Sequence, residues 1–130
     1  MIRLEHVTKR YGATLAVDDV SFSVAKGEVV GFLGPNGAGK STVLRMLSTW
    51  LAPDAGTVTV AGRDARREPL AVRRALGYLP EHNALYETMR VDRFLAFVGK
   101  MHGLGGKRLE ERARWVVEAC QLEGVLAKKI

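Results

Sequence analysis

Cysteine is almost absent from this sequence, which contains only Cys120. A single thiol excludes a disulfide framework and a metal site built from several cysteines within these residues. Cys120 follows Ala113, Val116 and Val117 at helical spacing, and free cysteine commonly packs as a small hydrophobic residue. We therefore expect a buried, unreactive thiol.

Long apolar runs are absent as well. No window approaches the roughly 18 to 20 continuous apolar residues that a membrane-spanning helix needs. The N-terminus opens on alternating apolar and polar residues and does not have the pattern of a signal peptide. We expect a soluble, cytoplasmic protein.

Aromatic residues make up only 7% of the chain, and the basic residues are dispersed in spite of a net charge of +6. Proteins that bind single-stranded nucleic acid combine a basic groove with stacked aromatic side chains. No such interleaving occurs in this sequence. We therefore interpret the positive charge as solvated surface charge and expect no nucleic-acid partner.

The hydrophobic residues, 47% of the chain, first follow strand-like patterns. Alternation of apolar and polar residues predicts one strand that ends near Tyr11 and others over 20–24 and 57–60. The run 28–33 is short and almost wholly apolar, as in a strand buried on both faces of a parallel sheet. Residues 75–79 are expected to return to the same sheet.

Helical spacing of apolar residues predicts four helices. One follows a glycine-rich segment and extends to Leu51, and a short one begins at Pro69, which suits a first helical turn. Two amphipathic helices follow, through 91–98 and 109–120. The chain is thus β-rich and then α/β, and it becomes helical from about residue 83.

The glycine-rich segment matches the pattern G-x-x-x-x-G-K-[ST] from Gly34 to Ser41. Glycines admit positive φ and bring backbone N–H groups close to phosphate oxygens. The helix that follows points its unpaired N–H groups and partial positive charge at the same anion. Lys40 supplies positive charge for the β- and γ-phosphates, the Ser41 hydroxyl can ligate Mg²⁺, and Thr42 can add a hydroxyl near the α-phosphate.

The candidate phosphate site therefore consists of consecutive residues. The alternative is a strand-to-helix turn whose glycines serve packing and whose lysine lies on the surface. The position of the motif between a predicted buried strand and a helix favours phosphate binding, because the mechanism requires this setting. The site residues are Gly34, Pro35, Asn36, Gly37, Ala38, Gly39, Lys40, Ser41 and Thr42.

A glycine-rich loop alone does not distinguish transporter ATPases, GTPases, kinases and recombinases, although no guanine-reading N-K-x-D pattern occurs. The run from Gly31 to Thr42 resembles the nucleotide-binding subunit of ABC transporters, and the turn and strand over 53–62 are similar to the same family. The resemblance implies an α/β P-loop NTPase fold. It would be a truncated ABC-type nucleotide-binding domain with an N-terminal antiparallel β part, a partial parallel core and the start of a helical subdomain.

The segment from Leu4 to Gly12 resembles the family's N-terminal strand with its adenine-stacking aromatic residue. By this resemblance Tyr11 lies under the adenine. An aromatic face in that place adds affinity with little discrimination between bases. The alternative is a half-buried tyrosine at the end of a strand.

Residues Leu76 to Glu81 resemble the segment leading into the family's Q-loop, which normally offers a glutamine to Mg²⁺ and the attacking water. Glu81 stands at that position, so the resemblance implies a catalytic and metal-binding role for its carboxylate. A carboxylate binds Mg²⁺ more strongly than an amide but adds a charge beside the γ-phosphate. The alternative is a solvated loop glutamate. The form Tyr-Leu-Pro-Glu-His-Asn looks most like ABC-2-type export ATPases, including the gliding-motility type.

Two elements of the family are not found in the sequence: an LSGGQ-like signature and an apolar run ending in Asp-Glu. The family uses them to hydrolyse ATP between two subunits. We therefore expect the N-terminal half of a nucleotide-binding domain, which holds ATP better than it cleaves it. The expected domains are a β and P-loop core over 1–82 and a truncated helical subdomain over 83–130.

The resemblance also implies ATP and Mg²⁺ as cofactors and two kinds of partner. These are a second ATP-binding subunit, arranged head-to-tail, and transmembrane permease subunits. The protein would lie at the inner face of the cell membrane and couple ATP hydrolysis to transport, with export favoured. Two alternatives stay open: a non-catalytic nucleotide-binding or regulatory module, and a soluble ABC-type ATPase that acts in repair or translation.

Overall fold

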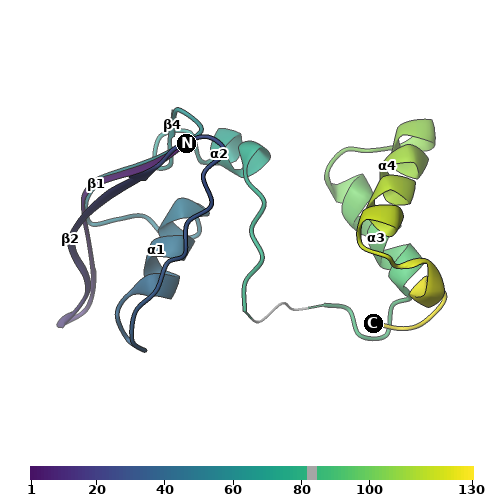
Figure 1. The fold of residues 1–130 in the computed structure, drawn as a ribbon, viewed down its shortest axis with the longest axis horizontal. Helices are drawn as coiled ribbons and strands as arrows, with labels where there is room; N and C mark the ends of the chain where they lie inside the picture. Colours follow the sequence, from purple (N-terminus) through teal and green to yellow (C-terminus); the bar gives the residue numbers. More distant parts are fainter. Residues whose placement is uncertain (82–84) are drawn as a thin grey trace. The chain divides into compact units, whose positions relative to one another are not determined.

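A computed structural model describes residues 1–81 and 85–130 (Figure 1). The chain forms two compact units, Met1–Leu79 and Pro80–Ile130. The domain boundary expected between 82 and 83 lies outside the described residues, as do His82 and Asn83 of the export-type motif. None of the helices in the described ranges is long and apolar enough to cross a membrane.

The first unit contains an antiparallel sheet with strand order β2-β1-β3-β4. Its strands are β1 (Ile2–Tyr11), β2 (Thr14–Val24), β3 (Ala55–Val60) and β4 (Arg63–Asp64). Leu4 pairs with Phe22 of β2 on one side and with Val58 of β3 on the other, so β1 is an inner strand of the sheet. The strands expected to end near Tyr11 and to cover 20–24 and 57–60 are therefore confirmed.

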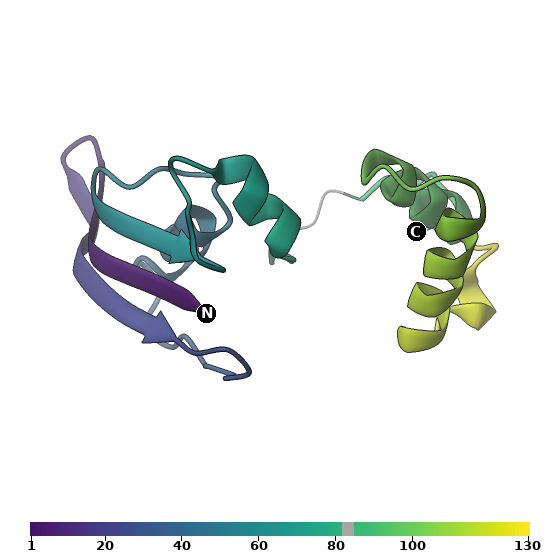
Figure 2. The same cartoon turned by 90° about the horizontal axis from the view of Figure 1, so that it is seen from above.

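Two helices complete this unit: α1 (Lys40–Leu47) and α2 (Pro69–Ala75). Figures 1 and 2 show α1 along one side of the sheet. Its apolar face joins the sheet in one core, because apolar side chains at helical spacing meet those on the inner face of the strands. The buried core members are Leu4, Val7, Val17, Val43, Met46, Leu47, Val58, Val60, Ala65 and Val72.

The expectation that the first helix extends to Leu51 is wrong. Helix α1 ends at Leu47, and Thr49 takes a positive φ of 62°. The N–H groups of Trp50 and Leu51 then both donate to the Arg45 carbonyl, at 2.9 and 3.2 Å. These bonds satisfy a carbonyl of the last turn and close the helix, although apolar spacing continues beyond it.

Two further expected strands are not formed among the described residues. Residues 28–33 and 76–79 are neither helix nor strand, and the side chains of Val29 and Leu33 are 98% and 92% exposed. The Phe32 ring lies against that of Phe22, with a distance of 5.6 Å between the ring centroids and a tilt of 34° between the planes. Burial on two faces requires neighbours on both sides, and no described strand pairs with the backbone of residues 28–33.

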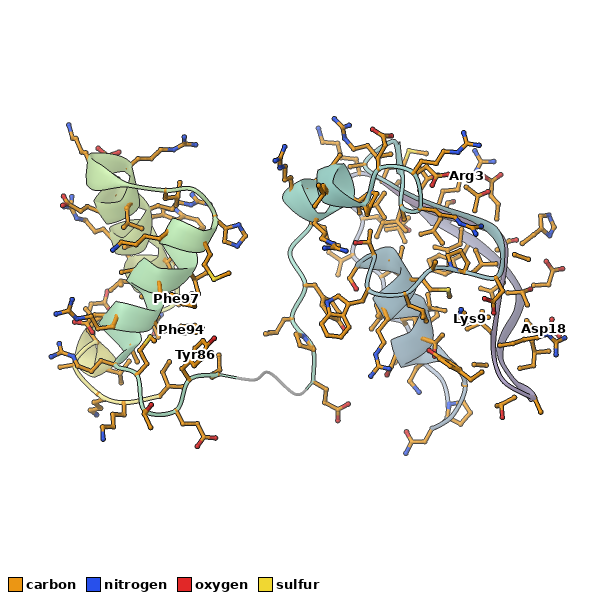
Figure 3. The ribbon with its side chains drawn as sticks, turned by 180° about the vertical axis from the view of Figure 1, so that it is seen from behind. Arg3, Lys9, Asp18, Tyr86, Phe94 and Phe97 are labelled. Atoms are coloured by element: carbon orange, nitrogen blue, oxygen red, sulfur yellow. The ribbon has the colours of Figure 1, made fainter. Side chains whose placement is uncertain are left out.

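The second unit contains α3 (Val91–Met101), α4 (Gly106–Ala119) and a short 3-10 helix η1 (Glu123–Val125). The C-terminal residues return to the start of α3, where the Val91 N–H donates to the Lys128 carbonyl at 3.0 Å. Tyr86, Phe94 and Phe97 form an aromatic cluster beside this junction (Figure 3). Cys120 is exposed, so the expected burial of its thiol is wrong. It follows the last residue of α4 and belongs to the turn beyond the helix.

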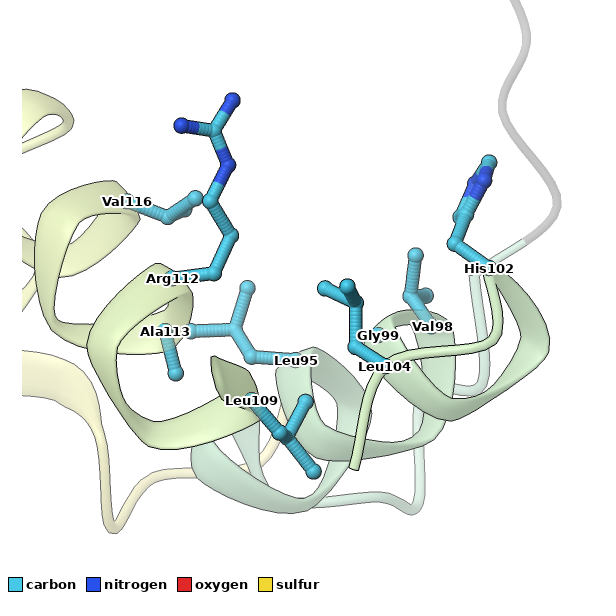
Figure 4. Close-up of a pocket in the computed structure, with 9 residues that line it drawn as sticks. All are labelled: Leu95, Val98, Gly99, His102, Leu104, Leu109, Arg112, Ala113 and Val116. Carbon is cyan, nitrogen blue, oxygen red and sulfur yellow. The ribbon is translucent and has the colours of Figure 1, made fainter. Parts of the chain in front are cut away.

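Helices α3 and α4 enclose a largely apolar groove of about 400 Å³ (Figure 4). Leu95 and Val98 of α3 face Leu109 and Val116 of α4 across it, and His102 and Arg112 project at its rim. The helices approach closely at Gly99, because a Cβ there would collide with the Leu109 side chain.

Asp54 ties the turn before β3 to β1. Its carboxylate accepts from Lys9 Nζ at 2.7 Å and from the Arg10 N–H at 2.8 Å. These hydrogen bonds, the Lys9 bond first, hold the pKa of Asp54 below its ordinary value of 3.8. Because the pKa is lower in the folded state, the interaction stabilises the fold above about pH 4, and this contribution is lost as pH falls through the folded-state pKa.

Asp54→Asn is therefore expected to lower the melting temperature at pH 7 by no more than about 4 °C, since the Asp54 carboxylate is itself partly exposed to water. The difference from the unchanged chain should shrink as pH falls through the lowered folded-state pKa of Asp54, because the protonated carboxyl is neutral like the amide. Asp18→Asn is the matched control. The Asp18 side chain has no hydrogen bond or ion pair among the described residues, whereas Lys9 pairs with Asp54 (Figure 3 labels Asp18 and Lys9). An equal loss in both variants would mean that net charge, and not this pair, sets the effect.

Candidate phosphate-binding site

The glycine-rich loop occupies residues 34–39, between the open segment 28–33 and α1. Gly37 and Gly39 have φ of 84° and 80°, a region that side chains with a Cβ rarely adopt. The Ala38 N–H donates to the Pro35 carbonyl at 3.3 Å, which closes a turn within the loop. Gly39 caps α1, and its carbonyl accepts the first helical bond, from Val43 at 2.9 Å. The two positive φ values therefore set the curvature that leads into the helix.

Gly39 has a second role that the motif does not reveal. A Cβ at this position would collide with the Ala16 carbonyl oxygen and lie 3.0 Å from Val17 Cγ2. The loop therefore rests directly on β2 at Gly39. Gly37 differs, because a Cβ there would meet nothing within 4 Å.

Lys40 reaches back across the loop from the first turn of α1. Its Nζ donates to the Gly34 and Pro35 carbonyls, at 2.7 Å each. The ammonium group is thus held at the mouth of the loop, and no acidic residue lies in the first turn of the helix. The lysine charge and the unpaired N–H groups of this turn together make the loop an electropositive site for an anion.

Ser41 and Thr42 continue the first turn of α1. Ser41 is exposed and Thr42 is half-buried. Neither hydroxyl is engaged by another described side chain, so the oxygen of Ser41 is accessible to a ligand. The remaining loop residues, Asn36 and Ala38, are also exposed. The structure thus places all nine predicted residues in one continuous loop and helix start.

Tyr11 lies at the end of the hairpin formed by β1 and β2. It pairs with Thr14, and its side chain is 45% exposed. Gly39 packs on Ala16, two residues further along β2 than Thr14, so the hairpin end and the loop belong to the same region of the first unit. Figure 1 shows both at the same end of this unit.

Glu81 belongs to the second unit and is exposed. The glycine-rich loop belongs to the first unit, and the catalytic and metal-binding roles of Glu81 stay predictions. No group of three or more His, Cys, Asp or Glu side chains in the described ranges could hold a metal ion.

A glycine-rich loop with left-handed glycines, followed by a helix whose first lysine folds back over the loop, defines a P-loop protein. Residues 17–130 match the family model described as ABC transporter. The chain therefore belongs to the ABC transporter family.

Several relatives are known by name. The chain is 45% identical over 121 residues to the daunorubicin resistance ATP-binding protein DrrA3 of Streptomyces coeruleorubidus, which covers 93% of this chain and 38% of that protein. It is 42% identical over 117 residues to the Nod factor export ATP-binding protein I of Mesorhizobium japonicum, which covers 90% of this chain and 34% of the relative. The chain thus spans less than half the length of these relatives.

Solved structures agree with the fold. An ATP-binding subunit of an ABC transporter matches with a TM-score of 0.82 at 29% identity, covering 98% of this chain and 53% of that chain. A dimeric ATP-binding cassette with bound ADP and Pi also matches with a TM-score of 0.82, covering 99% of this chain and 61% of the other. Its identity is 24%, so this second likeness shows the fold alone.

Proposed function

We propose that this chain is the nucleotide-binding part of an ABC transporter ATP-binding subunit and that it binds Mg-ATP through Gly34 to Thr42. The observation that carries the proposal is the loop itself. Lys40 Nζ is held 2.7 Å from two loop carbonyls, beside a helix start that has no acidic residue. An anion is the ligand that such a site favours. The names of the relatives, which are ATP-binding proteins, point to the same ligand.

The residues have separable roles in this proposal. Backbone N–H groups of the loop and of the first turn of α1 bind the phosphate oxygens, and Lys40 adds a full positive charge. Ser41 and Glu81 would hold Mg²⁺, which typically takes only one or two protein oxygens and otherwise binds phosphates and water. When bound, Mg²⁺ would neutralise part of the negative charge on the phosphates. Tyr11 would stack on the adenine from the end of the hairpin.

The relatives named above are more than twice as long as this chain. The whole protein would hydrolyse ATP and couple this reaction to transport. Its partners would be a second ATP-binding subunit, head-to-tail, and transmembrane permease subunits. Export is supported by the relatives, one of which is an export protein and another a resistance protein by name. Such a subunit would lie at the cytoplasmic face of the membrane, and Glu81 would act beside the γ-phosphate.

The test is a titration of the chain with ATP, measured by isothermal calorimetry. It is carried out once in the presence of Mg²⁺ and once in the presence of EDTA. Ser41→Ala is expected to weaken binding about tenfold with Mg²⁺, because one ligand of the ion is lost. With EDTA, the variant and the unchanged chain should bind ATP alike. An unchanged chain that does not bind ATP in either condition would refute the proposed function. A loss of the same size with EDTA would show that the hydroxyl serves the phosphates and not the metal.

A further inference from the structure

A second concave site lies in the first unit, at the C-terminal end of α1. It has a volume of about 220 Å³, and none of its lining residues belongs to the glycine-rich loop. Helix α1 has eight residues, so about 12 Å of helix separates this site from the loop. The lining residues are Thr49, Leu51, Ala52, Pro53, Ala65, Arg66, Pro69 and Arg73.

Arg73 is fixed in place by Thr49. Its Nε donates to Thr49 Oγ1 at 2.6 Å and its Nη2 to the Thr49 carbonyl at 3.3 Å. Thr49 is a β-branched residue with φ of 62°, a conformation that persists only where its surroundings hold it. A guanidinium has five N–H donors, so the two bonds to Thr49 leave three for another acceptor.

Arg66 is fixed through its backbone. Its N–H donates to Asp64 Oδ1 at 2.8 Å, and the Arg67 N–H donates to the same oxygen at 2.9 Å. The guanidinium of Arg66 has no hydrogen bond or ion pair to residues 1–81 or 85–130. The site is thus lined by two arginines on anchored backbone, one of which has no partner among the described residues.

The acidic residues nearby are already engaged. Asp64 accepts from the two backbone N–H groups, which hold its pKa below the ordinary value. Glu68 pairs with Arg63 at 3.1 Å, and Asp54 is bound by Lys9 and the Arg10 backbone. No acidic residue lines the site. Arg66 and Arg73 therefore carry positive charge that nothing described in this region neutralises.

We propose that this site, framed by Arg66 and Arg73, binds a phosphate group independently of the glycine-rich loop. Two guanidinium groups offer the planar, paired donors that match phosphate oxygens. The volume lies below the roughly 300 Å³ at which sites for drug-sized ligands begin, which suits a compact oxyanion better than a whole nucleotide. The phosphate group could belong to a soluble metabolite or to a lipid headgroup, and the two are separated by experiment.

The chain offers a matched pair of variants because each lining arginine is followed by an arginine that does not line the site. Arg66→Gln and Arg67→Gln remove the same charge from adjacent positions, and only the first should matter. Inorganic phosphate is titrated against the ¹⁵N-labelled chain, and amide shifts are followed at Ala65 and Arg66 and separately at Gly37 and Gly39. We expect Arg66→Gln to weaken binding at Ala65 about tenfold and Arg67→Gln less than about twofold.

Shifts confined to the glycine-rich loop, or equal losses in the two variants, would overturn the proposal. Arg73→Gln, with Arg74→Gln as its control, repeats the test from the other side of the site, and melting temperatures confirm that each variant is folded. Sedimentation with phosphatidylcholine vesicles, with and without phosphatidylglycerol, identifies the source of the phosphate. Vesicle binding that falls in Arg66→Gln but not in Arg67→Gln assigns the lipid headgroup. Binding of free phosphate without such vesicle binding assigns a soluble ligand.

Discussion

Lys40→Ala is expected to weaken ATP binding by about 100-fold or more, because the charge-assisted contact between the lysine and the phosphates is lost. The Nζ atom is already fixed by the Gly34 and Pro35 carbonyls, so little side-chain entropy is lost when ATP binds. Calorimetric titration with Mg-ATP measures the effect. The melting temperature without nucleotide should change little, since the two carbonyls are exposed to water in the variant.

Lys26→Ala is the control for this prediction. Lys26 is exposed, and its removal changes the net charge by the same amount. It should leave ATP affinity within about twofold, because a charge exposed to solvent is screened by salt. If Lys26→Ala and Lys40→Ala lose the same affinity, the lysine acts through the overall field of the protein and not at the loop.

Gly39→Ala is expected to destabilise the first unit by about 3 kcal/mol, from strain at positive φ together with the collision between the new Cβ and the Ala16 carbonyl. Gly37→Ala adds the same methyl group at nearly the same φ but into open space, so its cost should be only about 1 kcal/mol. Urea unfolding followed by circular dichroism distinguishes the two. Equal destabilisation would contradict the close packing of the loop on β2.

The antiparallel sheet could be predicted because alternation records which face of a strand is buried. Ile2, Leu4 and Phe22 belong to strands that pair within the first unit, so the pattern and the structure agree. The apolar run 28–33 reads as a strand buried on both faces, yet Val29 and Leu33 are open to solvent. Burial depends on what lies beside a segment, and the sequence of the segment does not contain that information.

The loop could be predicted because its residues are consecutive and its backbone demands specific residue types. Contacts that join distant residues could not be predicted in this way. The contacts of Gly39 with Ala16, of Asp54 with Lys9 and of Arg73 with Thr49 each join residues far apart in the sequence, so they depend on the tertiary fold. The end of α1 was missed for a similar reason, since Trp50 continues the apolar spacing although the backbone has already turned at Thr49.

The glycine-rich loop is held more firmly at its helix end than at the end that follows residues 28–33, which are neither helix nor strand. On the helix side the loop is seated on β2 through Gly39, whereas on the other side the described contacts of the segment are the stacking of Phe32 on Phe22 and a turn at Glu28. A strand that paired with this segment would restrict the loop before nucleotide arrives and so reduce the entropy lost on binding. Strand pairing and nucleotide affinity would then be thermodynamically linked, and each would strengthen the other by the same factor.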